Sequence, residues 1–319
     1  MRIDSARSLK EELRALMSAG FGSFGAIAGV GASSGLALGL IQGATRSDWR
    51  LAVRLHQRSQ HAFAFAARIN SIARGEVDAQ FVGTVYGPRA FRAGTPALTS
   101  RVRPLFPGVS IAHQASTAGT LGAFAYNANN ELVILSNNHV LCADGCSIGD
   151  GILQPGPIDG GRSYPNDMMA RLSSFLGLDF QGVNHVDAAT AVVMNGVQCV
   201  PRYCGGELAG ICQDPVAGLR VCKIGRTTGF TRGIVRAIEV DGVEVRYGNR
   251  TVVFDNQIEI AGLDGAFSDG GDSGALILDS NRRAVGLLFA GTPEAAGKTA
   301  VTYANPIDAV VNTLGLRLV

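Results

Sequence analysis

A short glycine-rich stretch holds the serine whose neighbours best suit it for chemistry. In Gly271-Asp272-Ser273-Gly274 the serine stands between an aspartate and a glycine, just ahead of an apolar run at 275–278. The same residue types build ordinary turns, so the tetrapeptide alone does not distinguish a nucleophile from a loop. A serine nucleophile also needs a base that takes its proton, an acid that orients the base, and donors for the developing oxyanion. The rest of the chain must supply them.

The base must come from the five histidines of the chain. His139 follows the apolar segment 132–135 within the stretch LVILSNNHVL. His185 stands two residues before Asp187, and in a strand these two side chains would project to the same face. His185 could therefore be the base itself, but we favour a partly exposed strand histidine. The remaining three lie in the amino-terminal region or in an early loop: His56, His61 and His113.

Asp187 is the best candidate for the acid. It leads into a run rich in alanine and valine at 188–193, which would bury its carboxylate and demand a partner for it. The sequence order is then His139, Asp187, Ser273, with each residue beside a strand-like segment. Three other aspartates stand in glycine-rich sequence and are interpreted as turn residues: Asp144, Asp150 and Asp159.

Composition favours a compact β protein. The chain has 319 residues, of which 42 are glycine, and charged residues make up only 17%. Few charges and many glycines suit short strands with tight turns better than long solvated helices. A net charge of +2 gives no reason to expect nucleic acid or an anionic membrane surface as a partner.

From about residue 105 onward the pattern is one of short strands. Segment 285–290 is apolar, and IVRAIEV-DG-VEVRY predicts a hairpin that turns at Asp241-Gly242. A helix should close the chain, with Asn305 as its cap and Pro306 at its first position. Many short strands and one terminal helix indicate a β-barrel or a sandwich.

The first 89 residues follow a different pattern, which predicts a small α/β domain. The expected order is a helix with a capping box at Ser8 and Glu11, a strand at 51–55, a helix at 61–74 and a strand at 77–85. The predicted organisation is therefore an amino-terminal domain at 1–89, which we interpret as regulatory, an Arg/Pro linker at 90–104 and a β domain at 105–319.

The amino-terminal region also bears on localisation. Residues 15–45 carry no charge, but their glycines favour a strand and turn over a membrane-spanning helix, so no membrane partner is expected. The first residues include Asp4, Glu11 and Glu12, which do not suit a secretory leader. A cytoplasmic location is therefore favoured.

The cysteines allow three interpretations. Disulfides require an oxidising compartment, and the spacings depart from the usual zinc knuckles, so free thiols are expected and no metal or other cofactor is predicted. All six fall in one part of the chain: Cys142, Cys146, Cys199, Cys204, Cys212 and Cys222.

The order of base, acid and nucleophile resembles that of the chymotrypsin/trypsin-like serine peptidases. The matching pieces are NNHV, VDAATAV, GDSGALIL, KIGRTTG and VGLLFAG, which together span roughly residues 104 to 315. The stretches RPLFPGVSIAH, TAGTLGA, SNNHVL and ILQPGPIDGG resemble, more narrowly, the trypsin-like domain related to the plant Narrow Leaf protein and its bacterial relatives. This resemblance implies a mainly β fold of two antiparallel barrels with a carboxyl-terminal helix, preceded by the small α/β domain.

The resemblance also implies roles for residues. Ser273 would be the nucleophile, His139 the general base and Asp187 the residue that holds the imidazole. The backbone N–H groups of Gly271 and Ser273 would form the oxyanion hole. The implied activity is that of a serine endopeptidase that acts on proteins or peptides through an acyl-enzyme, without a metal.

Two departures from the family pattern stand out. The specificity pocket would lie at Phe267, Phe289 and Gly291, where no carboxylate stands, so a preference for Arg or Lys before the cut is not expected. The Ile-Val-Gly-Gly start of the secreted members is absent, so Asp272 need not pair with a released amino terminus.

Two other functions remain open. Gly31-Ala32-Ser33-Ser34-Gly35 matches the nucleophile elbow of α/β-hydrolases, which would make Ser33 the nucleophile of an esterase, but the chain offers no HGGG-type loop, and a stretch this rich in Gly, Ala and Ser produces the pattern readily by chance. A non-catalytic binding module on a peptidase fold is the second alternative. The sequence predicts neither the natural substrate nor the oligomeric state.

Overall fold

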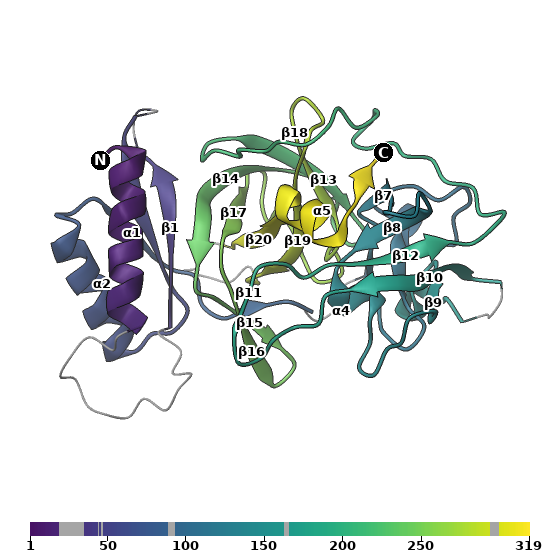
Figure 1. The fold of residues 1–319 in the computed structure, drawn as a ribbon, viewed down its shortest axis with the longest axis horizontal. Helices are drawn as coiled ribbons and strands as arrows, with labels where there is room; N and C mark the ends of the chain where they lie inside the picture. Colours follow the sequence, from purple (N-terminus) through teal and green to yellow (C-terminus); the bar gives the residue numbers. More distant parts are fainter. Residues whose placement is uncertain (19–34, 44, 46, 89–92, 163–165, 294–299) are drawn as a thin grey trace.

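The computed structural model describes residues 1–319 except 19–34, 44, 46, 89–92, 163–165 and 294–299. The chain is mainly β, as predicted, with one closed barrel, one curled half-barrel and few helices (Figure 1). The glycine-rich stretch around Ser33 and residues 90–92 of the expected linker lie outside the described residues. No helix in the described ranges is long and apolar enough to cross a membrane.

The carboxyl-terminal half forms the closed barrel. Antiparallel pairing runs from β13 (Arg220–Gly225) through β14 (Gly229–Asp241), β17 (Gln257–Gly262), β20 (Thr302–Pro306), β19 (Ala284–Gly291) and β18 (Leu276–Asp279) back to β13. β19 is buried along its whole length, in agreement with the apolar run predicted at 285–290. Helix α5 (Ile307–Leu314) follows β20 and buries Ile307, Val310 and Val311.

The half-barrel lies beside it (Figure 1) and is a second sheet. Its strands run in the order β21 (Arg317–Leu318), β7 (Ala123–Tyr126), β8 (Leu132–Ser136), β12 (Ala189–Val193), β10 (Met168–Phe175), β9 (Gly151–Leu153), β5 (Ser110–His113) and β6 (Gly119–Thr120). Its core includes Ile111, Phe124, Ile134, Ile152 and Met169. Two short helices lie in its connections, α4 (Asn138–Leu141) and η1 (Pro157–Asp159).

The amino-terminal segment extends the sheet of the closed barrel. It contains α1 (Ile3–Ser18), β1 (Leu36–Gln42), β2 (Trp49–Leu55), α2 (Gln60–Ile72), β3 (Val77–Phe81) and β4 (Val85–Tyr86). β1 pairs antiparallel with β2 and also with β14, so barrel and segment share one hydrogen-bonded sheet. The domain boundaries at 89 and 104 stay a prediction, and α3 (Pro96–Thr99) lies within the expected linker.

Three further short strands complete the fold. β15 (Val243–Tyr247) and β16 (Arg250–Phe254) form a hairpin between β14 and β17, and β11 (Val183–Asn184) pairs parallel with β16. β4 from the amino-terminal segment pairs parallel with β15 and touches β19 at its end, through Tyr86 and Gly291.

Several local predictions are confirmed and others need correction. The strand at 51–55 and the helix at 61–74 correspond to β2 and α2, and Ser59 caps α2 by accepting from the N–H of Ala62. However, α1 begins at Ile3, so the proposed capping box lies inside the helix. The strand expected at 77–85 is divided into β3 and β4, and α5 begins one residue after Pro306.

The predicted hairpin at Asp241-Gly242 is wrong. β14 pairs with β13, β17 and β1, while β15 pairs with β16 and β4. A type I′ turn needs positive φ at both central residues, and here only Gly242 has it, with φ of 76°. The Asp241 carboxylate instead accepts from the N–H of Asn256 and pairs with Lys10 of α1.

A buried ion pair ties β2 to the barrel. Arg54 is fully buried and its Nε lies 2.8 Å from Oε2 of Glu259 on β17, which is 1% exposed. We expect Arg54→Met to lower the free energy of unfolding by about 3–5 kcal/mol, because a buried carboxylate then loses its partner. Urea unfolding measures this loss of free energy. The control is Arg232→Met, which removes the cation of an exposed ion pair with Asp264. Equal effects of the two changes would contradict a structural role for the Arg54 pair.

Candidate active site

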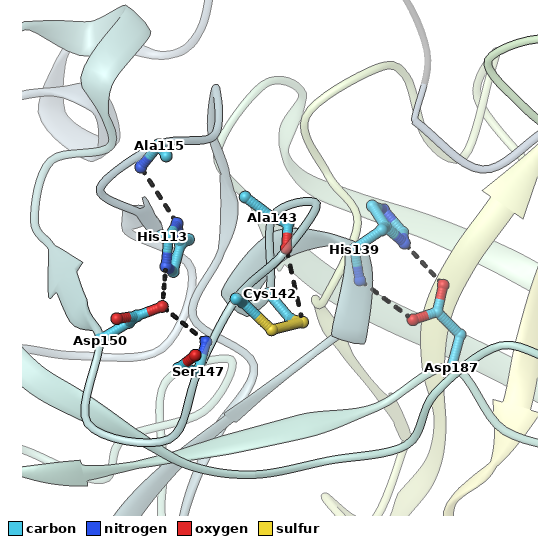
Figure 2. Close-up of a disulfide and its surroundings, with 9 residues drawn as sticks. His113, Ala115, His139, Cys142, Ala143, Ser147, Asp150 and Asp187 are labelled. Atoms are coloured by element: carbon cyan, nitrogen blue, oxygen red, sulfur yellow. Dashed lines mark hydrogen bonds and ion pairs between the residues drawn. A yellow bond between two sulfur atoms is a disulfide. The ribbon is translucent and has the colours of Figure 1, made fainter.

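His139 and Asp187 meet where two parts of the half-barrel converge. β8 ends at Ser136 and α4 begins at Asn138, which places His139 in the first turn of this short helix. Nδ1 of His139 lies 2.6 Å from Oδ2 of Asp187, and the backbone N–H of His139 donates to Oδ1 at 3.3 Å (Figure 2). These two contacts orient the imidazole, and Nε2 is left without a hydrogen-bond partner in the part of the chain that the structure describes.

The carboxylate of Asp187 is fully buried and held on several sides. The backbone of Asp187 is held as well, because Asn137 donates from Nδ2 to the Asp187 carbonyl at 2.7 Å and the Asp187 N–H donates to Oδ1 of Asn305 at 3.0 Å. Burial by itself would raise the pKa of Asp187, but the charge of His139 and hydrogen bonds from His139 and Tyr247 outweigh it and hold this pKa below its usual value. Asp187 is therefore ionised at neutral pH.

Ser273 lies in a tight turn that requires glycine on both sides. Gly271 and Gly274 have φ angles of 99° and 90°, which L side chains rarely adopt. The backbone of the turn is bound to both sheets, since the N–H of Thr120 donates to the carbonyl of Ser273 and the N–H of Gly274 donates to that of Leu288. Ser273 is thus fixed at the junction of the two sheets.

His139, Ser273 and Gly271 line one cavity of about 740 Å³. The structure therefore places the predicted base and nucleophile on one cavity, and the predicted acid contacts the base. Other walls come from the end of β10, the segment after it and the tip of the β15–β16 hairpin, including Phe175, Leu178, Phe180, Tyr247 and Arg250. The Arg250 guanidinium lies 3.2 Å from the centroid of the Phe180 ring.

Asp272 next to the nucleophile anchors the turn from inside. Its buried carboxylate lies 3.2 Å from Nζ of Lys223, which is also fully buried. It accepts from the N–H groups of Thr227, Thr228 and Asp269 as well. Asp272 therefore finds its cationic partner within the chain, in the predicted KIGRTTG stretch.

A second buried pair fixes the same region and was missed by the sequence reasoning. Arg226 donates from Nε to Oδ2 of Asp159 at 2.7 Å, and Ser110 donates to the same oxygen at 2.6 Å. The interpretation of Asp159 as a turn residue is thus incomplete, because its carboxylate joins the half-barrel to the barrel. Thr227 donates from Oγ1 to the carbonyl of Gly270 at 2.7 Å.

The three residues proposed for a specificity pocket lie in the barrel core. Phe267 is 2% exposed and Phe289 is fully buried, and the Phe289 ring packs against Phe254 at 4.7 Å between centroids. None of the three, Gly291 included, belongs to the cavity that Ser273 and His139 line. Their role as a specificity pocket stays a prediction.

The expectation of six free thiols is wrong for one pair. Cys142 and Cys146 form a disulfide that lines the cavity beside His139 (Figure 2). Because only three residues lie between these two cysteines, the bond closes a short loop. The other four are free: Cys199, Cys204, Cys212 and Cys222.

The remaining histidines differ from His139 in their surroundings. His185 is exposed and outside any strand, which fits its interpretation as a histidine without a catalytic role, although the predicted strand is absent there. His113 is buried and its Nε2 lies 3.1 Å from Asp150, which also accepts from the N–H of Ser147 (Figure 2). No group of three or more His, Cys, Asp or Glu in the described ranges could hold a metal ion.

Comparison with known proteins gives structural likeness only. Neither a protein-family model nor a curated protein matches the sequence. Solved structures that resemble this chain include Thermobifida fusca Protease A, with 20% identity and a TM-score of 0.47 over 67% of this chain and 97% of that one. The Nocardiopsis protease has 21% identity and a TM-score of 0.47 with the same coverage. Cellulomonas bogoriensis chymotrypsin has 21% identity and a TM-score of 0.46, again over 67% and 97%.

Proposed function

We propose that this protein is a serine endopeptidase that uses Ser273, His139 and Asp187. The observation that carries the proposal is the 2.6 Å contact between Nδ1 of His139 and a fully buried, ionised Asp187, with Ser273 on the same cavity. A buried carboxylate that fixes one imidazole nitrogen leaves the other available for proton transfer. Catalytic hydrogen bonds often tighten only when substrate is bound, so the unpartnered Nε2 is compatible with this role.

The chemistry proceeds in two halves. Oγ of Ser273 attacks the substrate carbonyl while its proton passes to Nε2 of His139, and Asp187 stabilises the resulting imidazolium. His139 then gives this proton to the leaving amine as the C–N bond breaks, which leaves an acyl-enzyme on Ser273. A water molecule repeats the sequence, and the acid product leaves with Ser273 and His139 restored.

The oxyanion would be stabilised by the N–H groups of Gly271 and Ser273. Thr227 supports this role, because its hydrogen bond draws the carbonyl of Gly270 toward Oγ1. The C=O and N–H of one trans peptide point in opposite directions, so the N–H of Gly271 is turned away from Thr227. Removal of one oxyanion donor typically costs about 10²–10³ in rate.

The finer parts of the proposal concern substrates and relatives. No carboxylate stands at Phe267, Phe289 or Gly291, so a preference for basic residues before the cut is not proposed. The narrower resemblance to the Narrow Leaf trypsin-like domain rests on motifs alone. A non-catalytic binding module remains the alternative, and catalysis by Ser33 is disfavoured because the chain has no HGGG-type loop and a stretch this rich in Gly, Ala and Ser matches the elbow pattern readily by chance.

The assay should use both small and extended substrates. Tyr86 of β4 pairs with Gly291 at the end of β19, and Pro88, two residues after β4, lines the cavity. Extended peptides commonly bind by adding a strand to the edge of a sheet. Here β4 already occupies the edge at the end of β19. A p-nitrophenyl ester reaches the cavity without needing that edge, so it reports on catalysis even where long peptides bind weakly.

We expect wild type to hydrolyse such an ester and unfolded casein, and Ser273→Ala to lose both activities by at least about 10³-fold. Ser280→Ala is the matched control, since Ser280 is exposed in the turn after β18. Equal rates for wild type and Ser273→Ala would exclude the proposed nucleophile. A folded wild type without any hydrolysis would favour the binding module.

A further inference from the structure

Tyr247 contacts both histidine and acid of the proposed site, although it belongs to a different part of the fold. Its hydroxyl lies 2.6 Å from Oδ2 of Asp187, the same oxygen that faces Nδ1 of His139. Its ring meets the His139 ring edge-on, with 5.6 Å between the centroids and 71° between the planes. One side chain therefore borders the His139–Asp187 pair on two sides.

The direction of the hydrogen bond follows from the surroundings. Burial of the hydroxyl and the neighbouring charge of Asp187 raise the pKa of Tyr247 well above its usual value. The phenol therefore keeps its proton, and Tyr247 donates to the carboxylate. The ring as a whole is only partly buried, while the carboxylate that it reaches is fully buried.

The position of Tyr247 is set by the amino-terminal segment. Tyr247 is the last residue of β15, next to the hairpin turn, and β15 pairs with β4 through Val245 and Val85. The N–H of Gly87 donates to the carbonyl of Arg246. A Cβ at Gly87 would lie 2.7 Å from Cε1 and Cζ of the Tyr247 ring, so only glycine leaves room for the ring there.

We propose that Tyr247 is a positioning residue for the His139–Asp187 pair, with its hydroxyl holding the Asp187 carboxylate in the orientation that binds Nδ1. This inference rests on the proposed function. Without the hydroxyl, Oδ2 loses one of its two partners, and only the two contacts from His139 then hold the rotation of the carboxylate. Residues 85–87 then help to hold Tyr247 in the active site, and they do not belong to an independent amino-terminal domain.

The test is Tyr247→Phe, which keeps the ring and removes the hydroxyl. We expect kcat for the p-nitrophenyl ester to fall about tenfold with KM unchanged, since a hydrogen bond to a charged group is lost while the binding surface stays. The acidic limb of the pH–rate profile should move to higher pH. The reason is that a carboxylate that no longer shares its charge with the phenol holds the imidazolium proton more strongly.

Tyr303→Phe is the matched control. Tyr303 is a fully buried tyrosine whose hydroxyl lies 3.3 Å from Oε2 of Glu259 in the barrel, away from the cavity. Loss of the Tyr303 hydroxyl should lower the melting temperature without a change in kcat or in the pH–rate profile. A purely structural role for Tyr247 would give the same pattern as this control.

Gly87→Ala provides a second variant that leaves the hydroxyl in place. The added Cβ displaces the ring, so kcat should fall as it does in Tyr247→Phe, and the double variant should show little further loss because no hydroxyl remains to be displaced. The inference is overturned if wild type is active and Tyr247→Phe has the same kcat and the same acidic limb of the pH–rate profile as wild type. A folded wild type that is inactive overturns the proposed function instead.

Discussion

Asp187→Asn lowers kcat by about 10⁴-fold if Asp187 orients the catalytic histidine, because an amide can hold His139 in the wrong tautomer while the geometry stays intact. The buried 2.6 Å contact to Nδ1 and the lowered pKa of the carboxyl are the features that make this effect large. Steady-state hydrolysis of the p-nitrophenyl ester at neutral pH measures it. Asp264→Asn, at an exposed aspartate, is the control and should leave kcat unchanged.

The same variant has a pH-dependent stability effect. The folded-state pKa of Asp187 lies below its usual value of 3.8, so its contribution to stability is fully present above that value and is lost as the pH falls through the folded pKa. The difference in the free energy of unfolding between wild type and Asp187→Asn should therefore narrow as the pH is lowered below about 4. Urea unfolding as a function of pH tests this, and a gap that widens in acid would contradict the assignment.

Lys223→Met should abolish most activity and also destabilise the fold. Lys223 and Asp272 are both fully buried, so loss of the ammonium leaves an uncompensated carboxylate at the nucleophile turn. Breaking such a pair lowers the free energy of unfolding by about 3–5 kcal/mol. The turn can recover part of this loss by rearranging around Ser273, which moves the nucleophile. We expect a lower urea midpoint and a fall in kcat of at least about 10²-fold, comparable to loss of an oxyanion donor.

Lys10→Met is the control for this effect. Lys10 of α1 also pairs with a buried carboxylate, that of Asp241 at 2.8 Å, but it lies in the amino-terminal helix and not at the nucleophile turn. It should lower stability without changing kcat of the folded protein. If Lys223→Met behaves in the same way, the Lys223–Asp272 pair supports the fold and not the alignment of Ser273.

The mainly β architecture could be predicted from the sequence because it depends on local signals, whereas the grouping of His139, Asp187 and Ser273 stays a prediction that rests on their order and on the family resemblance. Apolar runs mark β8 and β19, and the glycines around Ser273 match the positive φ angles at Gly271 and Gly274. A buried aspartate needs a partner, and the order of the residues points to His139.

Long-range contacts could not be predicted in this way. Asp241-Gly242 has the usual sequence of a hairpin turn, but β14 pairs with β17 and β1 instead of β15. The Asp241 carboxylate forms an ion pair with Lys10. The hairpin was expected between β14 and β15, but it forms between β15 and β16. Nothing in the sequence therefore indicated that Tyr247, at the end of β15, lies beside Asp187. The pairing of β1 with β14 also depends on residues about 200 positions apart in the chain, for which no local pattern exists.

Charge partners were missed for a related reason. Asp159 stands in a glycine-rich segment typical of turns, and only the folded chain brings it to Arg226 and Ser110. The Cys142–Cys146 bond was not predicted because a disulfide was expected only in an oxidising compartment. In both cases the local sequence gave no information on the partner.

The most direct measurement is to locate a fluorophosphonate adduct on the purified protein by mass spectrometry of its peptides. The reagent phosphonylates an activated serine, and we predict a single adduct on Ser273, absent in Ser273→Ala and strongly reduced in His139→Ala. Ser33→Ala should label like wild type. An adduct on Ser33, or labelling of Ser273 that is independent of His139, would contradict the proposed site.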